Sequence, residues 1–335
     1  MLGIDIGTKH IKICQVDMRA GAIYDVYTVM KKIPDKIIND SEENKVGVLS
    51  GIIKSMYKDN KFASRISASS VGSSEIMLRS LEFPQMPKNE LESSIRLQAE
   101  KYIFSDLSEM DLDFHVTSYG KTNMSVLLVA APKDLVDTRM KVIQRSGLDA
   151  VIMDIDSIAL ANCFLKLYPQ ADSQTAILMD IGHTKTNFTI LNNGKFCFAK
   201  HIDFGGLDIT SEIKKELEIP DAKAVEIKEN PQLWDEVGLN IKNVLRKVTP
   251  DLLEAIYRAV EYCGSQKLVR SIEKILLTGG SSELKGIDGF FSDILGIETV
   301  KWNPLLNVDL IQDKKIGRFV GIAMGLAVRE DMPVD

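Results

Sequence analysis

Two stretches of the chain share one pattern of apolar and polar positions, residues 2–16 and 176–191. In each, a short apolar run leads into an Asp, which is followed by Ile-Gly, a polar cluster and a second apolar run. Apolar runs of this length on either side of a glycine indicate two buried strands joined by a tight turn. We therefore predict two β-hairpins of the same kind, one at the N-terminus and one in the middle of the chain.

The remaining apolar periodicity predicts alternating strands and helices. Helical spacing predicts helices at 46–57, 90–103, 134–146, 157–168, 209–217, 252–263, 287–295 and 316–329. Alternation or short apolar runs predict strands at 22–30, 67–72, 76–81, 112–119, 125–131, 150–155, 195–203, 274–278 and 298–301. Gly147 is expected as a left-handed helix cap, Asp208 as the cap before 209–217, and Pro169 as a helix stop.

Composition excludes several classes of protein. The net charge of −6 predicts no broad nucleic-acid surface. The four cysteines are scattered without a CxxC pair, and the four histidines show no ligand spacing, which argues against a cysteine- or histidine-bound metal. The chain starts directly in a motif, so no signal peptide is expected. No apolar run reaches the roughly 18–20 residues of a membrane span, so we expect no direct membrane insertion.

The hairpin turns carry the candidate chemistry. Gly182 lets a ligand approach the backbone, and the turn N–H groups with the hydroxyls of Thr184 and Thr186 suit phosphate oxygens. Asp180, at the strand end, suits a divalent cation, bound directly or through water. Because residues 2–9 repeat the device, the sequence predicts two related lobes with one nucleotide between them.

These motifs carry a family resemblance. The two Asp-Ile-Gly hairpins, with residues 277–282 after a strand, resemble the phosphate-1, phosphate-2 and adenosine motifs of the actin/Hsp70/sugar-kinase superfamily. More narrowly, the chain resembles the PilM family of type IV pilus assembly proteins, a relative of the division protein FtsA. That resemblance spans essentially the whole chain and rests on residues 81–87, 99–103, 129–133, 154–162 and 305–308.

The resemblance implies a two-lobed, actin/Hsp70-like α/β ATPase fold built from duplicated ribonuclease-H-like domains, with an α+β subdomain inserted in the first lobe. The first lobe is predicted at 1–84 with 150–172 and 316–335, and the partner-binding insertion at 85–149. The second lobe is predicted at 173–203 with 271–315, and a helical adenosine-side subdomain at 204–270.

The same resemblance implies a nucleotide site. The matching positions are Asp5, Gly7, Thr8 and Lys9 in phosphate-1; Asp180, Gly182, Thr184 and Lys185 in phosphate-2; the glycine pair Gly205 and Gly206; and Gly279, Gly280 and Ser281 in the adenosine turn. Asp5 and Asp180 are the predicted magnesium residues. His183, within the second turn, is either a solvated residue or a phosphate donor.

Two further positions follow from the resemblance. Lys228 aligns with a lysine that approaches adenine or ribose in relatives, although Val225 stands where they often have Glu. Asp156 aligns with the residue that orients the attacking water, and a helix cap is its alternative role.

The implied function is an ATP- and magnesium-binding scaffold with at most slow hydrolysis. It would bind the cytoplasmic tail of the membrane protein PilN and other inner-membrane and motor proteins of the pilus, and lie in the cytoplasm, peripheral to the inner membrane. Homo-oligomerisation stays open. Two alternatives are an FtsA-like filament protein, although no amphipathic helix is expected at 329–335, and a small-molecule kinase, although no substrate base is evident beside Asp156.

Overall fold

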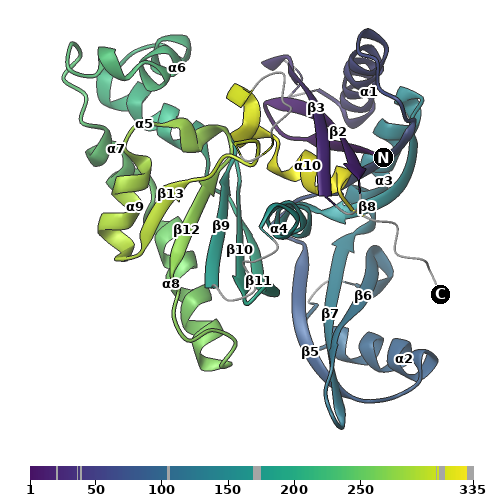
Figure 1. Cartoon of the computed structure of the whole chain (residues 1–335). Helices are drawn as coiled ribbons and strands as arrows, with labels where there is room; N and C mark the ends of the chain where they lie inside the picture. Colours follow the sequence, from purple (N-terminus) through teal and green to yellow (C-terminus); the bar gives the residue numbers. More distant parts are fainter. Residues whose placement is uncertain are drawn as a thin grey trace.

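A computed structural model describes residues 1–19, 22–35, 37, 40–103, 106–168, 175–306, 308 and 314–329. In this part of the chain, two five-stranded sheets and one three-stranded sheet carry the helices. Figure 1 shows the two larger sheets as separate lobes, with helices α4 and α10 between them.

The first lobe is built on a sheet of order β3-β2-β1-β4-β8. Its strands are β1 (Leu2–Ile6), β2 (His10–Arg19), β3 (Ala22–Lys32), β4 (Ile66–Val71) and β8 (Asp149–Ile155). Strands β1, β2 and β3 pair antiparallel, whereas β4 pairs parallel with both β1 and β8. The predicted N-terminal hairpin is therefore confirmed.

The second lobe repeats this arrangement in the order β11-β10-β9-β12-β13. Its strands are β9 (Thr175–Ile181), β10 (Thr186–Asn192), β11 (Lys195–Ile202), β12 (Lys274–Thr278) and β13 (Glu298–Lys301). Again three strands pair antiparallel and two add in parallel on the other side of the first strand. The predicted duplication of the two lobes is confirmed by this shared topology.

Two helices join the lobes, α4 (Asp156–Leu167) and α10 (Gly321–Ala327). Their apolar residues share one core with Cys14 of the first sheet and Leu178 of the second. The helices approach closely, because a Cβ on Gly325 would lie 1.7 Å from the carbonyl oxygen of Ala159. Only glycine fits there, so the glycine spacing near the C-terminus serves packing in the core.

Helices cover the outer faces of both large sheets. The first lobe carries α1 (Glu42–Asp59) and α3 (Lys133–Ser146), which pack against one another and on β1 and β2. The second lobe carries α5 (Gly206–Leu217), α6 (Asp221–Glu229), η4 (Pro231–Leu233), α7 (Ile241–Val248), α8 (Pro250–Ser265), η5 (Gly280–Glu283) and α9 (Ile287–Leu295). Gly147 ends α3 at φ 87°, as predicted.

A small sheet of order β5-β7-β6 forms a separate layer below the first lobe in Figure 1. It consists of β5 (Met77–Pro84), β6 (Met110–Tyr119) and β7 (Asn123–Pro132), with α2 (Lys88–Ala99) and the short η2 (Leu107–Glu109). These strands and α2 share a core of their own. This packing unit differs from the predicted insertion 85–149 at both ends. Strand β5 lies before residue 85 but packs with the small sheet, whereas α3 lies within 85–149 but packs in the first lobe. The domain division itself stays a prediction.

The predicted closing helix 316–329 is wrong in its first half. A 3-10 helix, η6 (Lys314–Phe319), precedes α10, and the break lies at Val320. The carbonyl oxygen of Arg318 accepts from the backbone N–H of Gly279 at 2.7 Å and from Oγ1 of Thr278 at 2.9 Å. Since this carbonyl is bonded to the other lobe, it does not continue an α-helical ladder.

Three local predictions also change. The helix expected at 90–103 is α2, which ends at Ala99, and the strand expected at 76–81 is β5, which continues to Pro84. Asp208 does not precede α5 but lies inside its first turn, where its carboxylate accepts from the backbone N–H of Gly205 at 2.8 Å. Pro169 and residues 330–335 lie outside the described residues.

Candidate functional site

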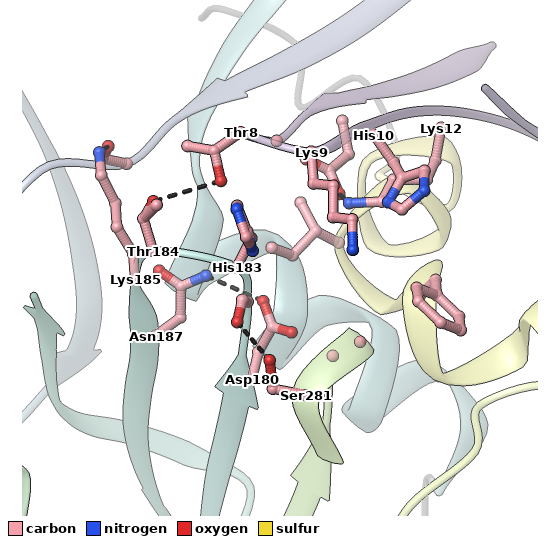
Figure 2. A pocket seen from close by; sticks show the side chains of 18 of the residues that line it. Thr8, Lys9, His10, Lys12, Asp180, His183, Thr184, Lys185, Asn187 and Ser281 are labelled. Carbon is pink, nitrogen blue, oxygen red and sulfur yellow. Dashed lines mark hydrogen bonds and ion pairs between the residues drawn. The ribbon is translucent and has the colours of Figure 1, made fainter. Parts of the chain in front are cut away.

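A cavity of about 820 Å³ lies between the two lobes and is lined by both hairpin turns. Figure 2 shows Thr8, Lys9, Asp180 and Thr184 converging on it from the two sheets. The predicted site residues that line it are Asp5, Gly7, Thr8, Lys9, Asp156, Asp180, Gly182, His183, Thr184, Lys185, Lys228, Gly279, Gly280 and Ser281. One cavity thus gathers residues from the whole length of the chain.

Gly205 and Gly206 support the second turn from behind and do not line the cavity. The backbone N–H of Gly206 donates to the carbonyl of Gly182 at 3.0 Å. A Cβ on Gly205 would lie 2.5 Å from the carbonyl carbon of His183. The glycine pair therefore lets the start of α5 approach the turn that faces the cavity.

The two turns have the same geometry. The N–H of Gly7 donates to the carbonyl of His10 at 3.0 Å, and the N–H of Gly182 donates to that of Lys185 at 2.8 Å. The hydroxyls of Thr8 and Thr184 are hydrogen-bonded to one another across the gap at 3.2 Å. Two hydroxyls that face each other in this way suit an oxygen-rich group between them.

Asp5 forms a buried ion pair with Lys12. The Nζ of Lys12 lies 2.8 Å from Oδ2 of Asp5, and the two residues are opposite one another in the β1–β2 hairpin. Burial lowers the pKa of Lys12, but the carboxylates of Asp5, Asp180 and Asp156 together raise it above its ordinary value, Asp5 most of all. Lys12 is therefore a fixed cation at the floor of the cavity.

Asp180 has a neutral partner instead. The Nδ2 of Asn187, opposite it in the β9–β10 hairpin, donates to Oδ2 of Asp180 at 3.0 Å. Burial raises the pKa of Asp180 to about 6, although Lys12 and the Asn187 hydrogen bond oppose the rise. The Oδ1 of Asn187 is buried and has no hydrogen-bond partner in the described part of the chain.

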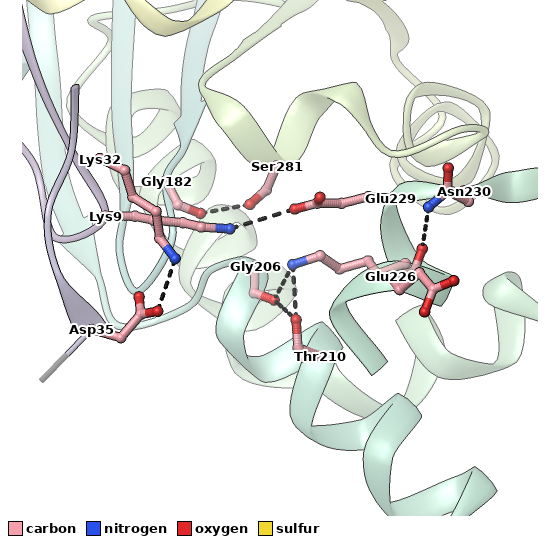
Figure 3. Close-up of polar contacts among 11 residues, drawn as sticks. Lys9, Lys32, Asp35, Gly182, Gly206, Thr210, Glu226, Glu229, Asn230 and Ser281 are labelled. Carbon is pink, nitrogen blue, oxygen red and sulfur yellow. Dashed lines mark hydrogen bonds and ion pairs between the residues drawn. The ribbon is translucent and has the colours of Figure 1, made fainter. Parts of the chain in front are cut away.

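The turn lysines reach across the cavity to the opposite lobe. Lys9 lies 3.4 Å from Glu229 of α6, as Figure 3 shows, and Lys185 donates to the carbonyl of Gly72 at 2.7 Å. Lys228 stays within the second lobe, where it donates to the carbonyl of Gly206 and to Oγ1 of Thr210. Burial, with Lys9 next in effect, lowers the pKa of Lys228 to about 8.

The turn at residues 279–281 links the second lobe to the C-terminal segment. Gly279 has φ 84°, and a Cβ there would lie 2.2 Å from Oδ1 of Asp180. Ser281 donates through its hydroxyl to the carbonyl of Gly182 at 2.7 Å, so this turn and the β9–β10 turn are joined. The ring of Phe319 lies against Gly280 and makes an edge contact with His10.

Both histidines at the cavity are shifted toward the neutral form. Burial lowers the pKa of His10 to about 4, and Lys12, Lys9 and Lys32 add to the shift. Burial, with Lys9 and Lys228, also lowers the pKa of His183. The cationic surroundings that disfavour imidazolium here favour an anionic ligand.

Sequence reasoning missed several charged and polar residues of the cavity wall: Lys12, Arg139, Asn187 and Glu229. Arg139 on α3 donates to the carbonyl of Ile6 at 3.0 Å. One signal was available, since Arg139 shares a helical face with Leu135 and Val142.

In all, seven Lys or Arg and five Asp or Glu line the cavity, although the chain carries a net charge of −6. Its positive excess suits a polyphosphate.

Comparisons with known proteins agree with this fold. The structure named "PilM-PilN type IV pilus biogenesis complex" aligns with a TM-score of 0.82 at 22% identity, covering 98% of this chain and 97% of the other. The ethanolamine utilization protein EutJ from Carboxydothermus hydrogenoformans aligns with a TM-score of 0.56 at 15% identity, over 98% and 88%. MreB5 of Spiroplasma citri bound to ADP aligns with a TM-score of 0.52 at 13% identity, over 97% and 94%.

The duplicated sheets, the paired turns and these neighbours define an actin-like ATPase fold. Within that class, the family described as type IV pilus assembly protein PilM matches residues 3–331. The chain belongs to this family. In the described residues, no helix combines the length and the apolar character that crossing a membrane requires.

Proposed function

We propose that this protein is a nucleotide-gated scaffold of the type IV pilus assembly machine, with one Mg-ATP bound between its lobes. The observation that carries nucleotide binding is the pair of facing turns, whose Thr8 and Thr184 hydroxyls meet in a cavity with an excess of cations. Triphosphate oxygens would take the place of the contact between the two hydroxyls, and the turn N–H groups would donate to them.

Asp180 is the residue best suited to the magnesium. Its carboxylate is partnered by an amide, whereas Asp5 is already neutralised by Lys12. Among the described residues, no group of three or more His, Cys, Asp or Glu suits a metal ion. This agrees with Mg²⁺, which proteins commonly hold through one or two carboxylates together with water and substrate phosphates. Bound there, the ion would neutralise phosphate charge, and Lys12 would do so from the first lobe.

Asp156 is the candidate for orienting the attacking water. It lies at the first turn of α4, and the hydroxyl of Ser70 donates to its Oδ1 at 2.6 Å. Phosphoryl transfer depends mainly on positioning and charge neutralisation. We assign no substrate base beside Asp156 among the described residues, so we expect turnover well below about 1 s⁻¹, the lower end for typical kinases.

The proposed partner is the cytoplasmic tail of PilN, which would hold this protein at the inner membrane beside other pilus and motor proteins. Strand β8 is an edge of the first sheet and β6 is an edge of the small sheet. Val151 on β8 is 52% exposed and Tyr119 on β6 is 71% exposed. Unpaired strand edges with exposed apolar side chains suit an extended peptide, which adds main-chain hydrogen bonds and fills side-chain pockets.

A peptide titration with matched variants tests this partner site. Val151→Lys should weaken binding of a fluorescent PilN tail peptide about tenfold or more, since it removes an anchoring contact. Tyr257→Lys is the control, because Tyr257 is 51% exposed on α8 of the second lobe. Equal affinity of both variants and the wild type would show that the tail binds elsewhere. Calorimetry with Mg-ATP on the same proteins tests the nucleotide site independently.

Family membership and full-length likeness favour this function over the FtsA-like and kinase alternatives. The kinase alternative makes a different prediction, namely a phosphorylated small-molecule product. A preparation that binds ATP and forms no such product would separate the two. Formation of a phosphorylated metabolite at about 1–100 s⁻¹, the usual range for kinases, would instead favour the enzyme.

A further inference from the structure

His201 on β11 is a buried imidazole that has no hydrogen-bond partner in the described part of the chain. The residue is 3% exposed, and both Nδ1 and Nε2 are unpartnered. Buried polar groups nearly always have a partner, so an imidazole with two free nitrogens points to a partner that arrives in another state of the molecule.

The position of His201 in the second sheet connects it to the cavity. The register pairs His201 with Asn187 on β10, and Asn187 with Asp180 on β9. Residues paired in this way project from the same face of a sheet. Asp180, Asn187 and His201 therefore form a row across the second lobe, and Oδ1 of Asn187 in the middle is unpartnered as well.

The far end of this row meets Asp156 of the first lobe at Gly72. A Cβ on Gly72 would lie 2.0 Å from Oδ2 of Asp156 and 2.9 Å from Cε1 of His201, so both side chains occupy the space beside this glycine. Ser70 donates to the other carboxylate oxygen of Asp156, and Lys185 donates to the carbonyl of Gly72. Asp156 of the first lobe and His201 of the second lobe thus meet beside Gly72.

We propose that His201 is a positioning residue for Asp156: in the nucleotide-bound state a ring nitrogen of His201 donates to Oδ2 of Asp156. Ser70 on Oδ1 and His201 on Oδ2 then fix the plane of the carboxylate toward the cavity. Because Asp156 and His201 belong to different lobes, movement of the lobes on binding changes their separation. The inference rests on the proposed nucleotide binding and deepens it.

The charged groups around His201 fit this role. Burial lowers its pKa, Lys185 lowers it further, and Asp156 and Asp203 oppose the shift. The imidazole is therefore biased toward the neutral form without nucleotide. A direct hydrogen bond to the Asp156 carboxylate would favour the charged form, and so would raise the pKa.

NMR of ¹³C-labelled imidazole rings can measure the pKa of His201, because the chain has four histidines and their signals can be told apart. His10 and His183 line the cavity, His115 is exposed on β6, and His201→Gln assigns the remaining signal. With Mg²⁺ and a non-hydrolysable ATP analogue, the pKa of His201 should rise by about one pH unit or more, as a new carboxylate partner produces. In Asp156→Asn this rise should disappear, and the His115 signal should not respond to the analogue in either protein.

The outcomes separate the two proposals. If His10 and His183 respond to the analogue while His201 titrates as before, the positioning role is wrong and nucleotide binding stands. If none of the three responds, both are wrong.

Single-turnover hydrolysis gives a second readout. His201→Phe should slow hydrolysis about tenfold at unchanged analogue affinity, the loss of roughly one hydrogen bond. His201→Gln should restore part of the rate, and Asp156→Asn combined with His201→Phe should lose no more than Asp156→Asn alone. A wild-type rate in His201→Phe would overturn the inference, and His115→Phe is the control for substituting a histidine elsewhere.

Discussion

The hairpins β1–β2 and β9–β10 place an Asp at the same position of the same turn, yet the residues opposite them differ. In the first lobe, Asp5 faces Lys12, which in turn faces Met30 on β3. In the second lobe, Asp180 faces Asn187, which faces His201. One row contains a closed ion pair, and the other contains a carboxylate and unpartnered polar atoms. The residue opposite on the returning strand therefore determines whether each Asp is already paired with a cation.

The largest expected effect concerns the closed pair of the first lobe. Asp5→Ala leaves the ammonium of Lys12 buried without its partner, because the side chain of Lys12 is only 14% exposed. Removing one partner of a buried pair costs about 3–5 kcal/mol of the free energy of unfolding. Urea denaturation would measure this loss. The double variant with Lys12→Met should recover most of it, and a loss below about 1 kcal/mol would show that the pair is not buried in solution.

The second effect concerns magnesium. Asp180→Asn should lower ATP affinity about 10- to 100-fold in the presence of Mg²⁺, the equivalent of one charged interaction, and little without it. Asp5→Asn should keep the magnesium dependence, since the carboxylate of Asp5 is already paired with Lys12. Calorimetry with Mg²⁺ or with EDTA distinguishes the two variants. An equal loss of magnesium dependence in both variants would show that the carboxylates of Asp5 and Asp180 contribute equally to the magnesium site.

The third effect is a pH dependence that arises at Asp180 of the second lobe. Burial raises the pKa of Asp180 to about 6, so the carboxylate is protonated and unable to hold a cation below this pH. Affinity for Mg-ATP should therefore fall by up to about tenfold per pH unit as the pH drops below 6.

Without nucleotide, the sign for stability is the opposite. A folded-state pKa above the ordinary value of 3.8 means that this contribution to the free energy of unfolding decreases as the pH rises through about 6. Asp180→Asn should remove both dependences, which calorimetry and urea denaturation at several pH values would show. Unchanged pH dependence in this variant would assign the titration to another group.

The smallest effect concerns the two turn lysines. Lys9 contacts Glu229 at 3.4 Å in an exposed pair, whereas Lys185 donates to the carbonyl of Gly72 at 2.7 Å in a partly buried place. Glu229→Gln should change the free energy of unfolding by less than about 1 kcal/mol. Lys185→Met should change it more, because a partly buried hydrogen bond from a charged group is lost. Thermal unfolding of both variants compares the two changes in the free energy of unfolding. The reverse order would show that the contact of Lys9 with Glu229 stabilises the protein more than the hydrogen bond of Lys185.

The sequence by itself determined the local elements and the identity of the turns. Alternating and helical apolar spacing specified the two hairpins, most other strands and most of the helices, because these patterns depend on neighbours within one or two turns of chain. The two Asp-Ile-Gly turns and the Gly279-Gly280 turn were visible for the same reason. Their repetition alone predicted that two similar lobes would face one cavity, and the structure has this arrangement.

Only the tertiary structure decided which side chains meet across the lobes. The break before α10 depends on a hydrogen bond between Arg318 and Gly279, and Arg139 lines the cavity because α3 packs on the first sheet. Lys12, Asn187 and His201 acquire their places from strand register, and Asp156 meets His201 because both fit beside Gly72. Contacts of this kind join residues far apart in the chain, so no local periodicity of the sequence predicts them. Burial then shifts the pKa values of the ionisable side chains that take part in them.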